Sequence, residues 1–124
     1  MNGSRSLVAF AASTDLARSE RFYVDVIGLT VVDRNPFAIV FDGEGAQLRV
    51  TAVDSHTPAP FTVLGWELAD IDTGIAELIT RGAVPIRYDG MEQDSRGVWT
   101  APGGMRVAWF HDPDRNVLSY QSRA

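Results

Sequence analysis

The sequence contains no cysteine and no lysine, and it has only two histidines among its 124 residues. Without cysteine, the chain can form neither a disulfide nor a thiolate metal site. All 11 basic residues are arginine and form no cluster, and the net charge is −5, so nucleic acids and anionic membranes are poor partners. A neutral or cationic small molecule is easier to accommodate.

The sequence also lacks any run of 18 apolar residues, so it predicts no membrane-spanning helix and no membrane partner. Residues 1–6 are polar and lack the apolar region of a signal peptide, from which we expect a cytoplasmic protein. The hydrophobic fraction of 45% and the charged fraction of 22% are ordinary for a globular protein. The length corresponds to one domain, or to two small halves that share a core.

The pattern of apolar residues and turn signals occurs twice along the chain. The first half predicts a strand over 7–12, a helix over 16–27, and strands over 29–32, 37–41 and 47–53. The second half predicts a strand over 63–68, a helix over 71–81, a strand over 84–88, a polar loop over 89–97, and a hairpin of 105–110 with 117–120. Asp15 and Asp70 suit the two helix N-caps, and Gly28 and Gly82 suit the two helix ends.

Two βαβββ modules of about fifty to sixty residues are too small to be stable alone by surface-to-volume scaling. We therefore predict an α+β fold, with a single domain over 1–124. The first module covers about 6–54, the linker 55–61, and the second module about 62–122.

The most distinctive stretch is the hairpin around Asp112-Pro113-Asp114-Arg115-Asn116, where proline and the Asp and Asn side chains favour a tight turn. Together with residues 14–19, 22–23, 27–29 and 67–71, it resembles the vicinal oxygen chelate superfamily, the glyoxalase/bleomycin-resistance/dioxygenase group. The resemblance covers nearly the whole chain. The family pattern has a glycine where this chain has Arg115.

The resemblance implies two modules whose curved mixed sheets surround a cavity. In metal-dependent members, His and Glu on the first and last strands of each module bind a divalent ion. The matching positions here are Val8, Arg49, Val63 and Ser119. None of them is an imidazole or a carboxylate, so we predict neither a metal nor any other cofactor.

The remaining candidates for a metal site are few. His56 lies in the proline-bearing linker and His111 at the edge of the last turn, and we expect both to be solvated loop residues. Glu67 is the one acidic residue in a strand predicted to face the cavity. One carboxylate does not make a metal site.

Strand alternation predicts a pocket with an apolar and aromatic lining and three polar side chains, those of Arg49, Glu67 and Ser119. This composition is typical of a small-molecule site. Trp99, Tyr88 and Met91 would form its rim, and the aromatic residues could equally be core packing. Arg49 and Glu67 could instead form an ion pair, with each other or across a dimer. The predicted ligand-binding residues are Phe10, Arg49, Val63, Glu67, Trp99, Met105, Trp109 and Ser119.

Three functions remain open. The first is a metal-free protein that sequesters an aromatic or apolar natural product or antibiotic, similar to the drug-binding branch of the superfamily. The second is an enzyme of the same fold (a lyase, isomerase, dioxygenase or thiol transferase), including metal-free acid–base chemistry by Glu67. The third is a non-catalytic dimer or regulatory module with a filled core. The resemblance also implies a homodimer.

Overall fold

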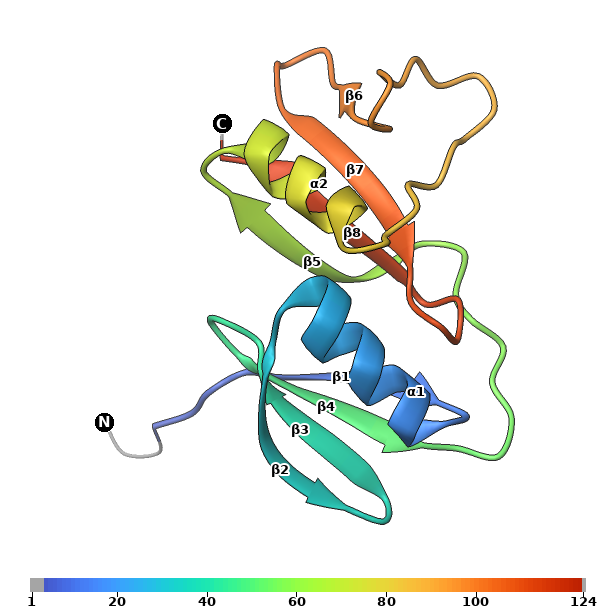
Figure 1. Ribbon diagram of the computed structural model, residues 1–124. Helices are drawn as coiled ribbons and strands as arrows, with labels where there is room; N and C mark the ends of the chain where they lie inside the picture. Colours follow the sequence, from blue (N-terminus) through green and yellow to red (C-terminus); the bar gives the residue numbers. More distant parts are fainter. Residues whose placement is uncertain (1–3, 124) are drawn as a thin grey trace. The chain divides into compact units, whose positions relative to one another are not determined.

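The computed structural model describes residues 4–123, and the chain divides into two compact units on either side of the bond between Thr57 and Pro58. Each unit contains one four-stranded mixed sheet with helical structure along one face (Figure 1). The predicted α+β class with βαβββ order is confirmed. Within residues 4–123, no helix is long and apolar enough to cross a lipid bilayer.

The sheet of the first unit has the strand order β1-β4-β3-β2, with β1 parallel to β4 and the other neighbours antiparallel. Its core side chains, which include Tyr23, Phe41 and Leu48, are almost fully buried. The elements are β1 (Val8–Ser13), α1 (Leu16–Arg21), η1 (Phe22–Ile27), β2 (Thr30–Asn35), β3 (Ala38–Asp42) and β4 (Gln47–Ala52).

The helix predicted over 16–27 changes its winding after Arg21. Residues Phe22–Ile27 form a π-helical segment, which ends where Gly28 adopts a left-handed φ of 91°. The backbone N–H groups of Gly28 and Leu29 both donate to the Tyr23 carbonyl, at 3.0 and 2.8 Å. The spacing of apolar residues indicated a helix here but not its wider turn, in which Tyr23 is fully buried.

The sheet of the second unit has the equivalent order β5-β8-β7-β6, with β5 parallel to β8. Helix α2 covers one face, which we call the helix face; the opposite one is the open face (Figure 1). On the helix face Ile75, Leu78 and Phe110 are buried. The elements are β5 (Thr62–Leu68), α2 (Ile71–Thr80), β6 (Trp99–Thr100), β7 (Arg106–His111) and β8 (Val117–Ser122).

The strand predicted over 84–88 is not formed as a regular strand. A single bridge joins Pro85 to Phe110, and the Ile86 N–H donates to the Trp109 carbonyl at 2.8 Å. The Gln93 side chain forms hydrogen bonds with two backbone groups of this segment. Its Nε2 donates to the Ile86 carbonyl and its Oε1 accepts from the Tyr88 N–H, both at 2.8 Å. Pro85 has no N–H to extend a ladder, and the Gln93 amide replaces a neighbouring strand.

The predicted repeat is confirmed at the helix ends. Asp15 accepts a hydrogen bond from the Arg18 N–H and Asp70 accepts one from the Thr73 N–H, both at 3.1 Å. These N-cap bonds satisfy donors that a helix otherwise leaves unpaired. Gly82, like Gly28, has a left-handed φ, here 107°.

Candidate functional site

The open face of the second sheet brings Gly65, Ser119 and Trp109 into one row. Gly65 pairs with Ser119 across β5 and β8, and Ser119 pairs with Trp109 across β8 and β7. A Cβ added to Gly65 would lie 3.1 Å from the Ser119 Oγ, so the two residues face the same side. Trp66 alternates to the helix face, where its ring stacks on Tyr120 at a centroid distance of 5.3 Å.

Trp109 of this row lies against two further aromatic side chains, those of Tyr88 and Trp99. We call these three residues the aromatic cluster. The Tyr88 ring meets the Trp109 ring edge-on, with centroids 5.3 Å apart at 89°. The Trp99 ring lies 6.2 Å from that of Trp109 at 38°. All three side chains are half-buried, so they leave aromatic surface accessible to a ligand. Burial raises the pKa of the Tyr88 hydroxyl, which therefore stays protonated and can donate a hydrogen bond.

A cleft of about 330 Å³ adjoins the aromatic cluster toward the turn between β7 and β8. His111 and Val117 face each other in register there, and His111 lies two residues beyond Trp109 on the same strand face. The volume falls within the range of small-molecule sites. The cleft is lined by Pro58, Ala59, Pro60, Ile86, Tyr88, His111, Arg115 and Val117.

His111 is the functional candidate that the sequence analysis placed wrongly. It is the last residue of β7 and is half-buried, not a solvated loop residue. Burial and then the positive charge of Arg115 lower the pKa of His111, while Asp112 acts in the opposite direction. The imidazole is therefore neutral at neutral pH and offers one N–H donor and one acceptor nitrogen. Because side chains alternate along a strand, the assignment of Trp109 to the open face would have placed His111 on the same face.

Arg115 occupies the turn with a left-handed φ of 66° and an exposed side chain. The Asp112 carboxylate holds the turn by accepting from the N–H groups of Asp114 and Asn116, at 3.0 and 2.8 Å, and from the Asn116 Nδ2 at 2.8 Å. The backbone thus adopts the conformation expected of a glycine, with an arginine in it.

The other predicted residues of the second unit lie around this region. Glu67, on the open face, is exposed and forms an ion pair with Arg123 at 3.3 Å. A bulge between Thr62 and Leu64 interrupts the strand alternation around Val63, which is 39% exposed. Met105 is half-buried just before β7, and its carbonyl accepts from the Ala101 N–H at 2.7 Å.

Phe10 and Arg49 belong to the first unit, where they face each other in register on β1 and β4. Phe10 is 62% exposed, and it lines a shallow hollow of about 250 Å³ with Ala11, Ala12 and Thr51. The predicted site residues therefore fall into two groups, one in each unit, and the larger group, in the second unit, includes Trp99 and Trp109 of the aromatic cluster.

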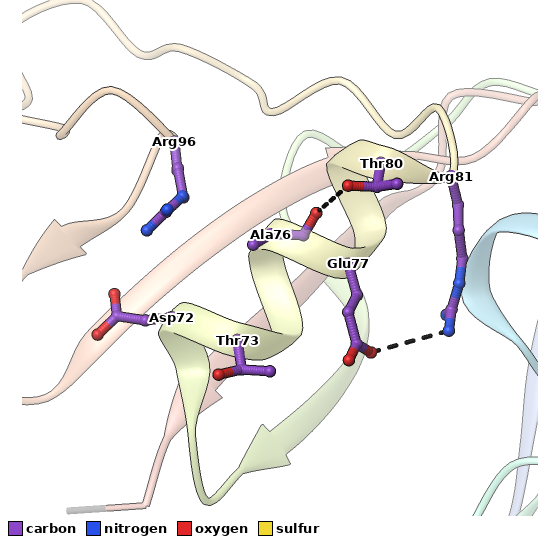
Figure 2. A pocket seen from close by; sticks show the side chains of 7 residues that line it. All are labelled: Asp72, Thr73, Ala76, Glu77, Thr80, Arg81 and Arg96. Atoms are coloured by element: carbon purple, nitrogen blue, oxygen red, sulfur yellow. Dashed lines mark hydrogen bonds and ion pairs between the residues drawn. The ribbon is translucent and has the colours of Figure 1, made fainter.

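A wider hollow of about 440 Å³ lies on the outer surface of α2, with Arg96 facing it from the loop (Figure 2). Its walls are charged: Glu77 pairs with Arg81 at 3.8 Å, and Asp72 accepts two hydrogen bonds from Arg106 at 2.8 and 2.9 Å. The Arg106 hydrogen bond lowers the pKa of the Asp72 carboxyl. Since much of its charge is paired within the protein, this hollow is less suited to an apolar ligand than the open face.

The chemistry of this chain does not fit the divalent metal that the family resemblance implies. The implied positions hold two aliphatic side chains, Val8 and Val63, the cationic Arg49, and the hydroxyl of Ser119. Hard or borderline divalent ions need imidazole or carboxylate ligands, and a guanidinium repels them. In the part of the chain that the structure describes, no three His, Cys, Asp or Glu residues are grouped so as to hold a metal ion.

Residues 7–120 match the family model of the Glyoxalase/Bleomycin resistance protein/Dioxygenase superfamily. The chain belongs to this superfamily. A search of curated proteins finds no match. The superfamily fold is also found in solved structures that resemble the chain at low sequence identity.

Three such structures cover nearly the whole chain. A superfamily member from Sphaerobacter thermophilus is 22% identical with a TM-score of 0.75, over 99% of this chain and 100% of the other. TioX from Micromonospora is 16% identical with a TM-score of 0.74, over 98% and 100%. A glyoxalase-related enzyme from Fulvimarina pelagi is 20% identical with a TM-score of 0.73, over 96% and 88%. At these identities the likeness shows the fold alone.

Proposed function

We propose that this protein binds an aromatic or apolar small molecule, of the natural-product or antibiotic class, and sequesters it without chemical change. The observation that carries this proposal is the aromatic cluster beside the 330 Å³ cleft on the open face of the second sheet. The description of the superfamily names both a resistance protein and enzymes. Membership is therefore compatible with sequestration of a small molecule.

The physical basis is stacking and burial of apolar surface. An aromatic pair contributes about 0.5–1.5 kcal/mol beyond its buried area, and Trp109 and Trp99 offer two such partners. Ser119 and Tyr88 supply hydroxyl groups that can orient a polar substituent. The residues at the family's metal positions offer no group that would hold a catalytic ion, which favours binding over metal-dependent turnover.

A fluorescence titration tests this proposal. Aromatic polyketides and enediynes should quench tryptophan emission in a saturable way, and Trp109→Phe should weaken binding about tenfold, through loss of part of the stacking surface. The matched control is Trp66→Phe, because Trp66 lies on the helix face, stacked on Tyr120. No saturable quenching across a broad panel, or an equal effect of both variants, would contradict the proposal.

A metal-free acid–base enzyme is the second candidate, since the neutral His111 lines the cleft with Tyr88. Long incubation of a bound compound, followed by mass spectrometry, separates the two functions. Recovery of unchanged compound supports sequestration, and a product that disappears in His111→Gln supports catalysis. Metal analysis of the purified protein tests the metal-dependent form directly.

We also propose that the protein is a homodimer. Strands β1 and β5 are sheet edges, and exposed apolar side chains lie on or beside them. Leu7 is 74%, Phe10 62% and Phe61 65% exposed. Unpaired strand edges and exposed apolar residues favour association with a second chain. Elution from a sizing column at the 13.6 kDa of a single chain would contradict this.

A further inference from the structure

We propose that the cleft selects ligands with an anionic group, such as an aromatic carboxylic acid, and that the Arg115 guanidinium binds this group beside His111 and Tyr88. This inference rests on the proposed function, because the apolar part of the ligand would occupy the same open face. It adds a specificity that neither the net charge of the chain nor the aromatic cluster predicts.

The charge of the cleft differs from that of the whole chain. The protein has 16 acidic residues and a net charge of −5, yet no Asp or Glu lines the cleft. Arg115 supplies the one permanent charge of the lining. Among the ion pairs within residues 4–123, none involves the Arg115 side chain, so the guanidinium is available to a ligand. The nearby Asp112 carboxylate is buried and accepts the hydrogen bonds of the turn.

The neighbours of Arg115 suit a carboxylate attached to an apolar body. The Tyr88 hydroxyl is protonated and the His111 imidazole is neutral, so each can donate one hydrogen bond without adding charge. A guanidinium binds a carboxylate through two parallel hydrogen bonds. The other walls are apolar: Pro58, Ala59, Pro60, Ile86 and Val117. An anionic group on an aromatic or aliphatic body matches this composition.

The backbone of Arg115 provides a way to separate its binding role from its structural role. Arg115 has a left-handed φ of 66°, which strains an L-residue, whereas glycine adopts the conformation without that strain. Glu44 has a similar φ of 63°, so strain alone does not indicate a site. The difference is that Arg115 lines a cleft, whereas Glu44 is exposed in the turn between β3 and β4.

The test compares 1-naphthoate with 1-naphthalenemethanol, which share the aromatic body but differ in charge. In calorimetric titration at low salt, the wild-type protein should bind the acid about tenfold more tightly than the alcohol, since a hydrogen bond to a charged group is worth that factor or more. Arg115→Gly should abolish the preference while raising the melting temperature. Arg115→Lys should retain part of the preference. Added salt should weaken the binding of 1-naphthoate and leave the affinity for the alcohol unchanged.

Glu44→Gly is the matched control: it should raise the melting temperature in the same way and leave both affinities unchanged. Equal affinity for the two probes, or an unchanged preference in Arg115→Gly, would overturn the inference while leaving the proposed function intact. Failure of both probes to shift the NMR signals of Tyr88 and Trp109 would also overturn it. The proposed function is judged separately by the antibiotic titration.

Discussion

The two units have the same order of elements, but the turns that join their last two strands differ. In the first unit, Asp42 is exposed and accepts one hydrogen bond, from the Glu44 N–H at 2.9 Å. In the second unit, Asp112 is 4% exposed and accepts three from the turn that it caps. Both turns contain a left-handed residue other than glycine.

This comparison shows how one module can be adapted without changing its topology. The first unit completes its sheet with a regular six-residue strand, β2, whereas the corresponding edge of the second unit has only the two-residue strand β6 and a loop braced by Gln93. That loop brings Tyr88 against Trp109, and the rigid turn presents Arg115 to the cleft. The irregular parts of the second unit are therefore the parts that form the candidate site.

The largest expected effect is at the buried turn. Asp112→Ala leaves the N–H groups of Asp114 and Asn116 without their acceptor, and it should lower the free energy of unfolding by about 3 kcal/mol. Asp42→Ala, at the exposed turn, should cost about 0.5–1 kcal/mol, because water replaces its single bond. Urea unfolding measures both. Equal losses in the free energy of unfolding would contradict this prediction, because they would show that the two Asp side chains stabilise their turns equally.

The second effect is at Gly97, where the loop passes close to Pro85. Gly97 has a φ of 85°, and an added Cβ would lie 2.5 Å from the Pro85 Cβ. Gly97→Ala should therefore destabilise by about 2–3 kcal/mol, combining backbone strain with a clash against a rigid ring. Trp109 fluorescence should report the displaced loop.

Gly45 provides the matched control in the first unit. It also has a positive φ, 127°, but an added Cβ would have no neighbour within 4 Å. Gly45→Ala should cost only the backbone strain, about 1–2 kcal/mol. If Gly97→Ala costs no more than Gly45→Ala, the loop moves freely and does not hold Tyr88 in place.

Local signals in the sequence were sufficient for much of the fold. Asp15 and Asp70 mark both helix starts because an Asx side chain can satisfy the first free N–H groups. Alternation assigned Trp66 to the helix face and Trp109 to the open face, because side chains in a strand alternate strictly. These features depend on residues that are close together in the sequence.

The parts that could not be predicted depend on contacts between distant residues. The prediction of a strand over 84–88 was wrong because Pro85 forms only a single bridge, to Phe110 near the end of β7. The Gln93 side chain, and not a paired strand, then accepts from the Tyr88 N–H and donates to the Ile86 carbonyl. The bulge between Thr62 and Leu64 interrupts the alternation of side chains along β5. The methyl group of Thr62 lies 3.8 Å from a Cβ placed on Gly65. For the candidate site, the sequence indicated the aromatic residues but not the cleft, because His111 and Arg115 meet only once the turn is folded.

The smallest effect concerns pH and sharpens the same comparison, because His111 ends β7 where the first unit has Asp42 at the end of β3. Burial, then the charge of Arg115, lowers the pKa of folded His111, while the carboxylate of Asp112 opposes this. The unfolded chain, with a histidine pKa near ~6.5, takes up the proton first as pH falls. The stability that His111 contributes is therefore fully present above about pH 6.5 and is lost as pH falls through the lower pKa of the folded state.

Urea unfolding of the wild-type protein and of His111→Gln, between pH 7 and pH 5, tests this sign. The stability advantage of the wild type over the variant should shrink as pH falls, and the NMR titration of His111 should show a midpoint below its ordinary value. Arg115→Gly should move that midpoint upward but not fully restore it, because burial is the larger cause and remains. A stability advantage that grows toward pH 5 would mean that Asp112 dominates His111, and that the cleft is acidic where we infer it to be basic.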